Sequence, residues 1–304
     1  MLNIEYDSLK SWIRLILLFF LGITGTVGMW SVVVVMPAIE SDFNIDRGKA
    51  SLLYATTMVG FGLGNFLIGK IIDKYGLKLP IIVATITLVL SYLIGTVSTK
   101  FWHLLILQIF MGTAAATFFG PSMADIGNFF EKRRGLAVAI IASANYVAGA
   151  FWPLIISYFL ETTTWKDVYF YIALICIIIM IPISFFLKNN ISQNESDINT
   201  EASNSKLTNL SPSALQTLLI LAGIGCCLAM AMPQVHIVAL CVERGFGLSI
   251  GAEILAVMLF SGMISRVGFG YLSDKIGPVY TLFIGSLLQM ISLVFFLPFD
   301  SQLS

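Results

Sequence analysis

The amino-acid sequence predicts an all-α membrane protein built from two helical bundles. Of its 304 residues, 58% are hydrophobic and only 11% are charged, and the mean hydropathy is +0.91. Soluble domains carry about 25% charged residues, so this chain is suited to lipid. Two further observations support the prediction: the apolar residues form segments of membrane-spanning length, and one short motif occurs twice. The net charge of zero gives no reason to expect a nucleic-acid partner.

The apolar segments are long enough for nine transmembrane helices, each of which needs ~20 mostly apolar residues. The predicted spans are residues 12–38, 49–72, 79–98, 101–124, 135–160, 167–187, 213–240, 250–272 and 279–298. With the N-terminus inside, eleven of the 17 Lys and Arg residues lie on the inner side and five on the outer side. Cytoplasmic loops are enriched in these residues. We therefore expect a multi-pass protein of the cell (inner) membrane with a cytoplasmic N-terminus.

One long polar segment divides the chain. Residues 188–212 are rich in Asn and Ser and poor in apolar residues, which is typical of a flexible linker. The predicted domains are a six-helix bundle at 1–187, a flexible cytoplasmic linker at 188–212, and three helices of a second bundle at 213–304.

A motif in the first half recurs in the second. Asn65–Gly76 reads NFLIGKIIDKYG and Arg266–Gly277 reads RVGFGYLSDKIG. At a constant offset, four residues of the first copy recur in the second: Gly69, Asp73, Lys74 and Gly76 match Gly270, Asp274, Lys275 and Gly277. Two copies in corresponding places indicate duplication, from which transporters are commonly built. Two equal halves need about three more spans, so we expect this sequence to be C-terminally truncated.

Each motif residue suits an inner turn that takes part in a gate. The first glycine of each copy lets two helices approach closely, and the last permits a positive φ. The aspartate can cap a helix or pair with a basic residue. Arg133 and Arg134 are candidates for the same gate. The alternatives are that short inner loops collect such residues, and that the two arginines only set the topology.

These residues resemble known transporter signatures. GKIIDKYGLK and GYLSDKIG resemble the inner-loop signature of the major facilitator superfamily, and the similarity spans the whole chain. Phe129–Gly149 resembles the monocarboxylate-porter signature, although Ala139 and Ala144 stand where that family prefers glycine. Arg266, with the glycine and aspartate that follow it, is similar to the eighth helix of monocarboxylate and oxalate/formate porters. The resemblance implies a major facilitator fold and an arginine that binds the substrate carboxylate.

Physical chemistry supports the same role for Arg266. A guanidinium is always charged, and its planar fork matches a carboxylate bidentately. Holding it at membrane depth costs at least ~2.5 kcal/mol, so it normally faces a partner, a cavity or a ligand. The alternative is a structural arginine that extends its head to water. Monocarboxylate porters tend to carry an acid one turn before this arginine, where this chain has Gly262, so H+ coupling rests on the analogy alone.

Five other residues are candidates for the substrate site, each with a structural alternative. Asn65 is the counterpart of Arg266 in the first copy, and Asn145 lies in the small-residue stretch of the fifth span; either could instead form an interhelical hydrogen bond. Tyr146 and Trp152 are possible cavity walls. His236 follows a proline late in the seventh span, where a broken helix often borders a pathway, but it could equally be a packed histidine.

The sequence therefore predicts a secondary active transporter of a small organic anion, a monocarboxylate, working by alternating access with possible H+ coupling. One alternative is a facilitator-type exporter of neutral or amphiphilic compounds, in which Arg266 is structural. Others are an anion-sensing membrane protein and an inactive fragment. Walker, GxSxG, HExxH and CxxC motifs are absent, so we expect no enzyme, cofactor or metal site. The expected partners are the anion, H+ and the lipid bilayer, and we expect a monomer.

Overall fold

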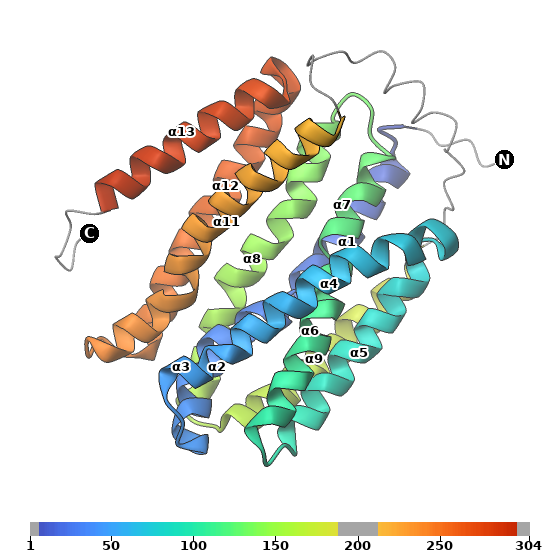
Figure 1. Ribbon diagram of the computed structural model, residues 1–304. Helices are drawn as coiled ribbons and strands as arrows, with labels where there is room; N and C mark the ends of the chain where they lie inside the picture. Colours follow the sequence, from blue (N-terminus) through green and yellow to red (C-terminus); the bar gives the residue numbers. More distant parts are fainter. Residues whose placement is uncertain (1–5, 188–211, 297–304) are drawn as a thin grey trace.

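The computed structural model describes residues 6–187 and 212–296, and the regular structure in this part of the chain is entirely helical (Figure 1). This confirms the predicted all-α class. The predicted linker, apart from Pro212, lies outside the described residues. The helices are α1 (Leu9–Gly25), α2 (Val27–Phe43), α3 (Arg47–Ala50), α4 (Leu52–Tyr75), α5 (Lys78–Thr96), α6 (Phe101–Thr117), α7 (Gly120–Gly127), α8 (Arg134–Leu160), α9 (Trp165–Phe186), α11 (Pro212–Glu243), α12 (Leu248–Ile276) and α13 (Pro278–Phe296).

Eight spans in the described ranges are long and apolar enough to cross a membrane. Three of them contain two helices each: α1 and α2 form Leu9–Phe43, α3 and most of α4 form Arg47–Gly69, and α6 and α7 form Phe101–Gly127. The break between α6 and α7 follows from Pro121 in the first turn of α7, because proline has no N–H to continue the hydrogen-bond ladder. The ninth predicted span corresponds to α13, whose apolar stretch Pro278–Ser292 is shorter, and its predicted end at 298 lies beyond the described residues.

The last glycine of each motif copy ends a long helix. α4 ends before Gly76, which has a φ of 73°, and α12 ends before Gly277, which has a φ of 87°. The N–H of Gly76 donates to the carbonyl of Ile72 at 2.8 Å, and that of Gly277 donates to the carbonyl of Ser273 at 3.0 Å. A positive φ is readily adopted only by glycine. Both glycines thus adopt the positive φ that a turn at this position requires.

The two halves of the chain meet where α8 packs along α12 (Figure 1). On its other sides α8 packs against α1, α2 and α7, while α11 and α13 pack on α12. The close approach depends on glycine: a Cβ placed on Gly270 would collide with the Cβ of Ala139 and lie 3.1 Å from the carbonyl oxygen of Gly135. Small residues at a helix crossing allow this contact in a membrane.

Large apolar side chains occur both inside the molecule and on its outer surface. Tyr92 and Tyr169 are fully buried, with their rings in edge-to-face contact at a centroid distance of 5.1 Å. Phe66, Tyr158 and Phe186 are exposed. Such exposure is costly in water but favourable against lipid tails. The fold is therefore that of a multi-pass membrane protein.

Candidate functional site

Arg266 lies on α12, about 15 Å along the helix from its C-terminal end. Its half-buried side chain stacks on Tyr146 of α8, with Cζ 4.2 Å from the ring centroid. Nη2 also donates a hydrogen bond to the Tyr146 hydroxyl at 3.2 Å. Among the described residues, no carboxylate lies within ion-pair distance of the guanidinium. In this part of the chain, Arg266 therefore has a neutral partner and keeps an uncompensated positive charge.

Tyr146 joins three helices at this point. Its side chain is 8% exposed, and its hydroxyl donates to the Sδ of Met230 on α11 at 2.9 Å. Its ring lies against Gly262 of α12, one turn before Arg266, where an added Cβ would collide with the ring. The absence of a side chain at Gly262 is what makes room for the ring beside the guanidinium.

Asn145, next to Tyr146 on α8, holds an aromatic side chain of the first half. The indole N–H of Trp30 on α2 donates to both the backbone oxygen of Asn145, at 3.0 Å, and its Oδ1, at 2.9 Å. The Trp30 ring and Leu259 of α12 meet above Gly149, where a Cβ would lie about 2.5 Å from each. Asn145 thus positions an aromatic side chain between the two halves.

Three other predicted site residues have different partners or lie at the surface. Asn65 on α4 donates to the carbonyl of Phe61 in its own helix at 2.9 Å. Trp152 on α8 is 2% exposed, and its indole N–H donates to the carbonyl of Ile23 on α1 at 2.9 Å. His236 is exposed on α11. The structure therefore brings Arg266 and Tyr146 together, while Asn145 binds Trp30 and Trp152 packs within the first half.

The aspartate of the second motif copy binds the N-terminus of α8. The Oδ1 of Asp274 accepts the backbone N–H of Gly135 at 2.9 Å, and Oδ2 accepts that of Leu136 at 3.0 Å. A helix N-terminus has unsatisfied N–H groups and a partial positive charge, so a carboxylate there is stabilising. This contact connects the two halves of the chain at one end of the molecule.

The other predicted gate residues lie near Asp274 or occupy the equivalent positions of the first motif copy. Arg133 and Arg134 are exposed and, within the described ranges, make no ion pair with Asp274, whose carboxylate is bound by backbone N–H groups instead. Lys74 and Lys275 each lie over a tyrosine ring, at 5.2 Å and 4.6 Å from the centroid. A Cβ on Gly69 would meet open space, unlike one on Gly270. The side chain of Asp73 lies outside the described set.

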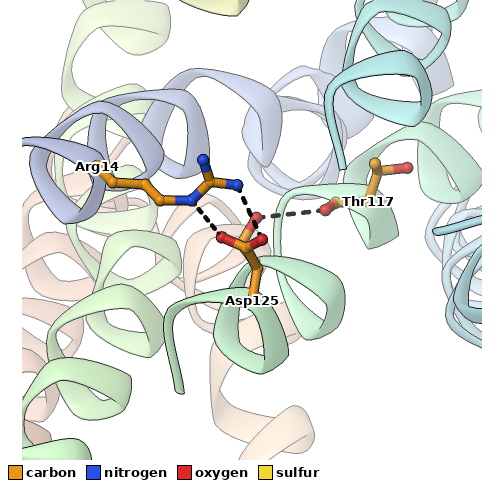
Figure 2. Close-up of polar contacts among 4 residues, drawn as sticks. Arg14, Thr117 and Asp125 are labelled. Carbon is orange, nitrogen blue, oxygen red and sulfur yellow. Dashed lines mark hydrogen bonds and ion pairs between the residues drawn. The ribbon is translucent and has the colours of Figure 1, made fainter. Parts of the chain in front are cut away.

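Sequence reasoning missed a buried ion pair between α1 and α7, shown in Figure 2. The Arg14 guanidinium donates from Nε to Asp125 Oδ2 at 2.6 Å and from Nη2 to Oδ1 at 2.8 Å. The two side chains are 9% and 11% exposed, and the guanidinium lies over the ring of Phe129 at 4.7 Å. The available signal was Asp125, an acidic residue directly after the apolar fourth span. Arg14 had been interpreted only as a charge that flanks the first span.

A second ion pair was also missed, at the opposite end of α12 from Asp274. Arg47, which begins α3, contacts Glu243, the last residue of α11, through Nη1 and Oε1. Both side chains are partly exposed. This pair again connects the first half of the chain to the second. The Asp274 contact and the Arg47–Glu243 pair thus connect the halves at opposite ends of α12, with Arg266 between them.

A multi-pass helical protein with two halves in contact at both ends, and a charged group between these contacts, has the architecture common among membrane transporters. Comparison with known proteins agrees. Residues 18–304 match the Major Facilitator Superfamily, and the chain belongs to this family.

Its relatives include fungal transporters. The MFS-type transporter pytF of Aspergillus terreus is 22% identical over 216 residues, which cover 71% of this chain and 72% of the relative. MFS-type transporter 1 of an Ophiocordyceps species is 22% identical over 244 residues, covering 79% of this chain and 53% of the relative. The fujikurins efflux protein of Gibberella fujikuroi is 32% identical over 102 residues, covering 33% of this chain and 22% of the relative. The chain thus aligns with about half or less of the last two relatives.

Proposed function

We propose that this member of the superfamily is a secondary active transporter of a small organic anion, a monocarboxylate, and that Arg266 binds the carboxylate. One observation carries the proposal: a guanidinium within a membrane-spanning helix whose partner among the described residues is a neutral hydroxyl. A charge at this depth is costly and is retained where it serves a ligand or a pathway. A carboxylate is the ligand that matches its charge and its planar pair of donors.

The proposed mechanism is alternating access, with the two halves rocking about the Arg266 site. The Asp274 contact with α8 and the Arg47–Glu243 pair lie at opposite ends of α12. Opening a path to one end requires breaking the contact at that end while the other is kept. By the positive-inside argument, we assign the Asp274 end to the cytoplasm.

H+ coupling is part of the proposal through the resemblance to monocarboxylate porters. Asp125 is a buried carboxylate that Arg14 binds through two hydrogen bonds, so we give this pair a structural role. We propose that the carboxyl group of the substrate itself carries the proton.

A second candidate is export of neutral or amphiphilic compounds, with Arg266 in a structural role. The names of two relatives favour it: the fujikurins efflux protein and the agnestins efflux protein of Paecilomyces divaricatus, the latter 30% identical over 91 residues. The guanidinium stacks on the Tyr146 ring, and the Tyr146 hydroxyl contacts the thioether of Met230; these apolar groups also suit a compound with an apolar body.

The test is uptake into proteoliposomes of a panel of labelled monocarboxylates, with and without an imposed pH gradient. We expect Arg266→Gln to reduce uptake of the transported carboxylate about tenfold or more, because a hydrogen-bonded charge pair is lost. Arg244→Gln is the matched control, since Arg244 is exposed in the turn after α11. Carboxylate uptake by Arg266→Gln equal to that of the control would favour the second candidate.

A further inference from the structure

The Tyr146 hydroxyl occupies the position that a ligand oxygen would take on Arg266. It accepts a hydrogen bond from Nη2 at 3.2 Å, while the ring lies beneath the guanidinium at 4.2 Å. The hydroxyl is neutral, so this bond is weaker than the charge-assisted, bidentate contact that a carboxylate makes. The ring contact is a separate interaction and needs no hydroxyl.

The position of this ring is tightly fixed. It lies against the backbone of α12 at Gly262, where a Cβ would approach within 2.6 Å of Cδ1. Any side chain at this position, an acidic one included, would exclude the ring. Tyr146 also belongs to α8 in the first half, whereas Arg266 and Gly262 belong to the second. The hydroxyl is therefore supplied from across the interface between the halves.

We propose that Tyr146 is a positioning residue that acts as a displaceable internal ligand of Arg266. In the substrate-free protein, its hydroxyl holds the guanidinium over the ring. An incoming carboxylate replaces the hydroxyl on Nη2, while the ring stays beneath the guanidinium and keeps it oriented. This inference rests on the proposed function, because it concerns the same anion site.

The displacement sets a threshold for binding. A ligand that takes the place of the hydroxyl on Nη2 must first break this contact, and a carboxylate replaces it with two hydrogen bonds between opposite charges. An uncharged amide of the same shape has one acceptor oxygen and no charge, so it regains less. Removing the hydroxyl while keeping the ring should therefore tighten binding, which the loss of a merely structural contact would not do.

The experiment measures the dissociation constant of benzoate, with benzamide as its uncharged counterpart, for the purified full chain in detergent. The variants are Tyr146→Phe, Arg266→Gln and the double variant. Tyr158→Phe is the matched control, because Tyr158 lies on the same helix and is exposed. We expect Tyr146→Phe to bind benzoate about three- to tenfold more tightly than the wild type, which corresponds to the net contribution of one ordinary hydrogen bond.

The outcomes separate this inference from the proposed function. Tyr158→Phe should match the wild type, and Tyr146→Phe should add nothing in the Arg266→Gln background. If Arg266→Gln abolishes benzoate binding but Tyr146→Phe binds no more tightly than Tyr158→Phe, the internal ligand is refuted and the anion site stands. If Arg266→Gln binds benzoate as the wild type does, or if the wild type binds it no better than benzamide, both proposals fall.

Discussion

Replacing Asp274 by asparagine tests whether the contact with α8 holds the two halves together at that end. The carboxylate accepts two backbone N–H groups, at 2.9 Å and 3.0 Å. Asparagine keeps one acceptor oxygen, so it loses one hydrogen bond worth roughly 0.5–1.5 kcal/mol and a helix-terminus charge worth roughly 0.3–1 kcal/mol. Because Asp274 is exposed, we expect the lower part of this range, about 1 kcal/mol. That equals about a fivefold shift of population toward the state open at this end.

The assay is pulsed electron–electron distance measurement between spin labels at positions 132 and 276, both exposed, with the four cysteines replaced by alanine. Asp274→Asn should increase the population at long distances. Asp46→Asn is the matched control, because Asp46 caps α3 through the N–H of Lys49 at 2.9 Å and lies wholly within the first half. A distance distribution for Asp274→Asn that matches this control would refute the reasoning.

Three further predictions concern stability and the opposite end. Arg14→Met leaves Asp125 buried without its partner and should lower the free energy of unfolding in detergent by about 3–5 kcal/mol. The double variant Arg14→Met with Asp125→Leu should recover most of the lost stability. A single variant as stable as the wild type would contradict the structural role of the pair. Arg47→Glu should weaken closure at the Arg47–Glu243 end by about 0.2–1 kcal/mol, measured as a larger population at long spin-label distances across that end. Adding Glu243→Arg should restore the closed population. If this charge exchange fails to restore it, the pair does not hold that end closed. A backbone N–H holds the pKa of Asp46 below its usual 3.8, so its contribution to stability is present above that pH and is lost as the pH falls through the lower folded value. Asp46→Asn should therefore reduce the pH dependence of the thermal unfolding midpoint at acid pH. If this pH dependence is unchanged, the titration of Asp46 does not contribute to stability.

Local signals in the sequence were enough to predict the apolar spans and several helix ends, although not the break between α1 and α2. Spans of apolar residues reveal transmembrane helices because lipid offers no hydrogen bonds to the backbone. Gly76 and Gly277 could be predicted as helix ends because a positive φ is a property of one residue. For Asp274 the same reasoning left two roles open, a helix cap or a partner of a basic residue, and did not indicate which helix it binds.

The contacts between distant residues could not be predicted in this way. Arg14 and Asp125 are 111 positions apart, and the sequence does not say that α1 and α7 are neighbours. Trp152 was predicted as a cavity wall, yet it packs on α1. Its helix is apolar on every side, so periodicity does not distinguish the face toward a cavity from the face toward the core. Tyr146 and Arg266 were both predicted site residues, but their contact follows only from the packing of α8 on α12.

The most direct test of the central claim is an experimental structure of the protein with its transported carboxylate bound. We predict both carboxylate oxygens within about 3 Å of the Arg266 guanidinium nitrogens, with the Tyr146 hydroxyl displaced and its ring still beneath the guanidinium. A complex in which the substrate binds elsewhere, while Arg266 keeps its hydrogen bond to Tyr146, would contradict the account.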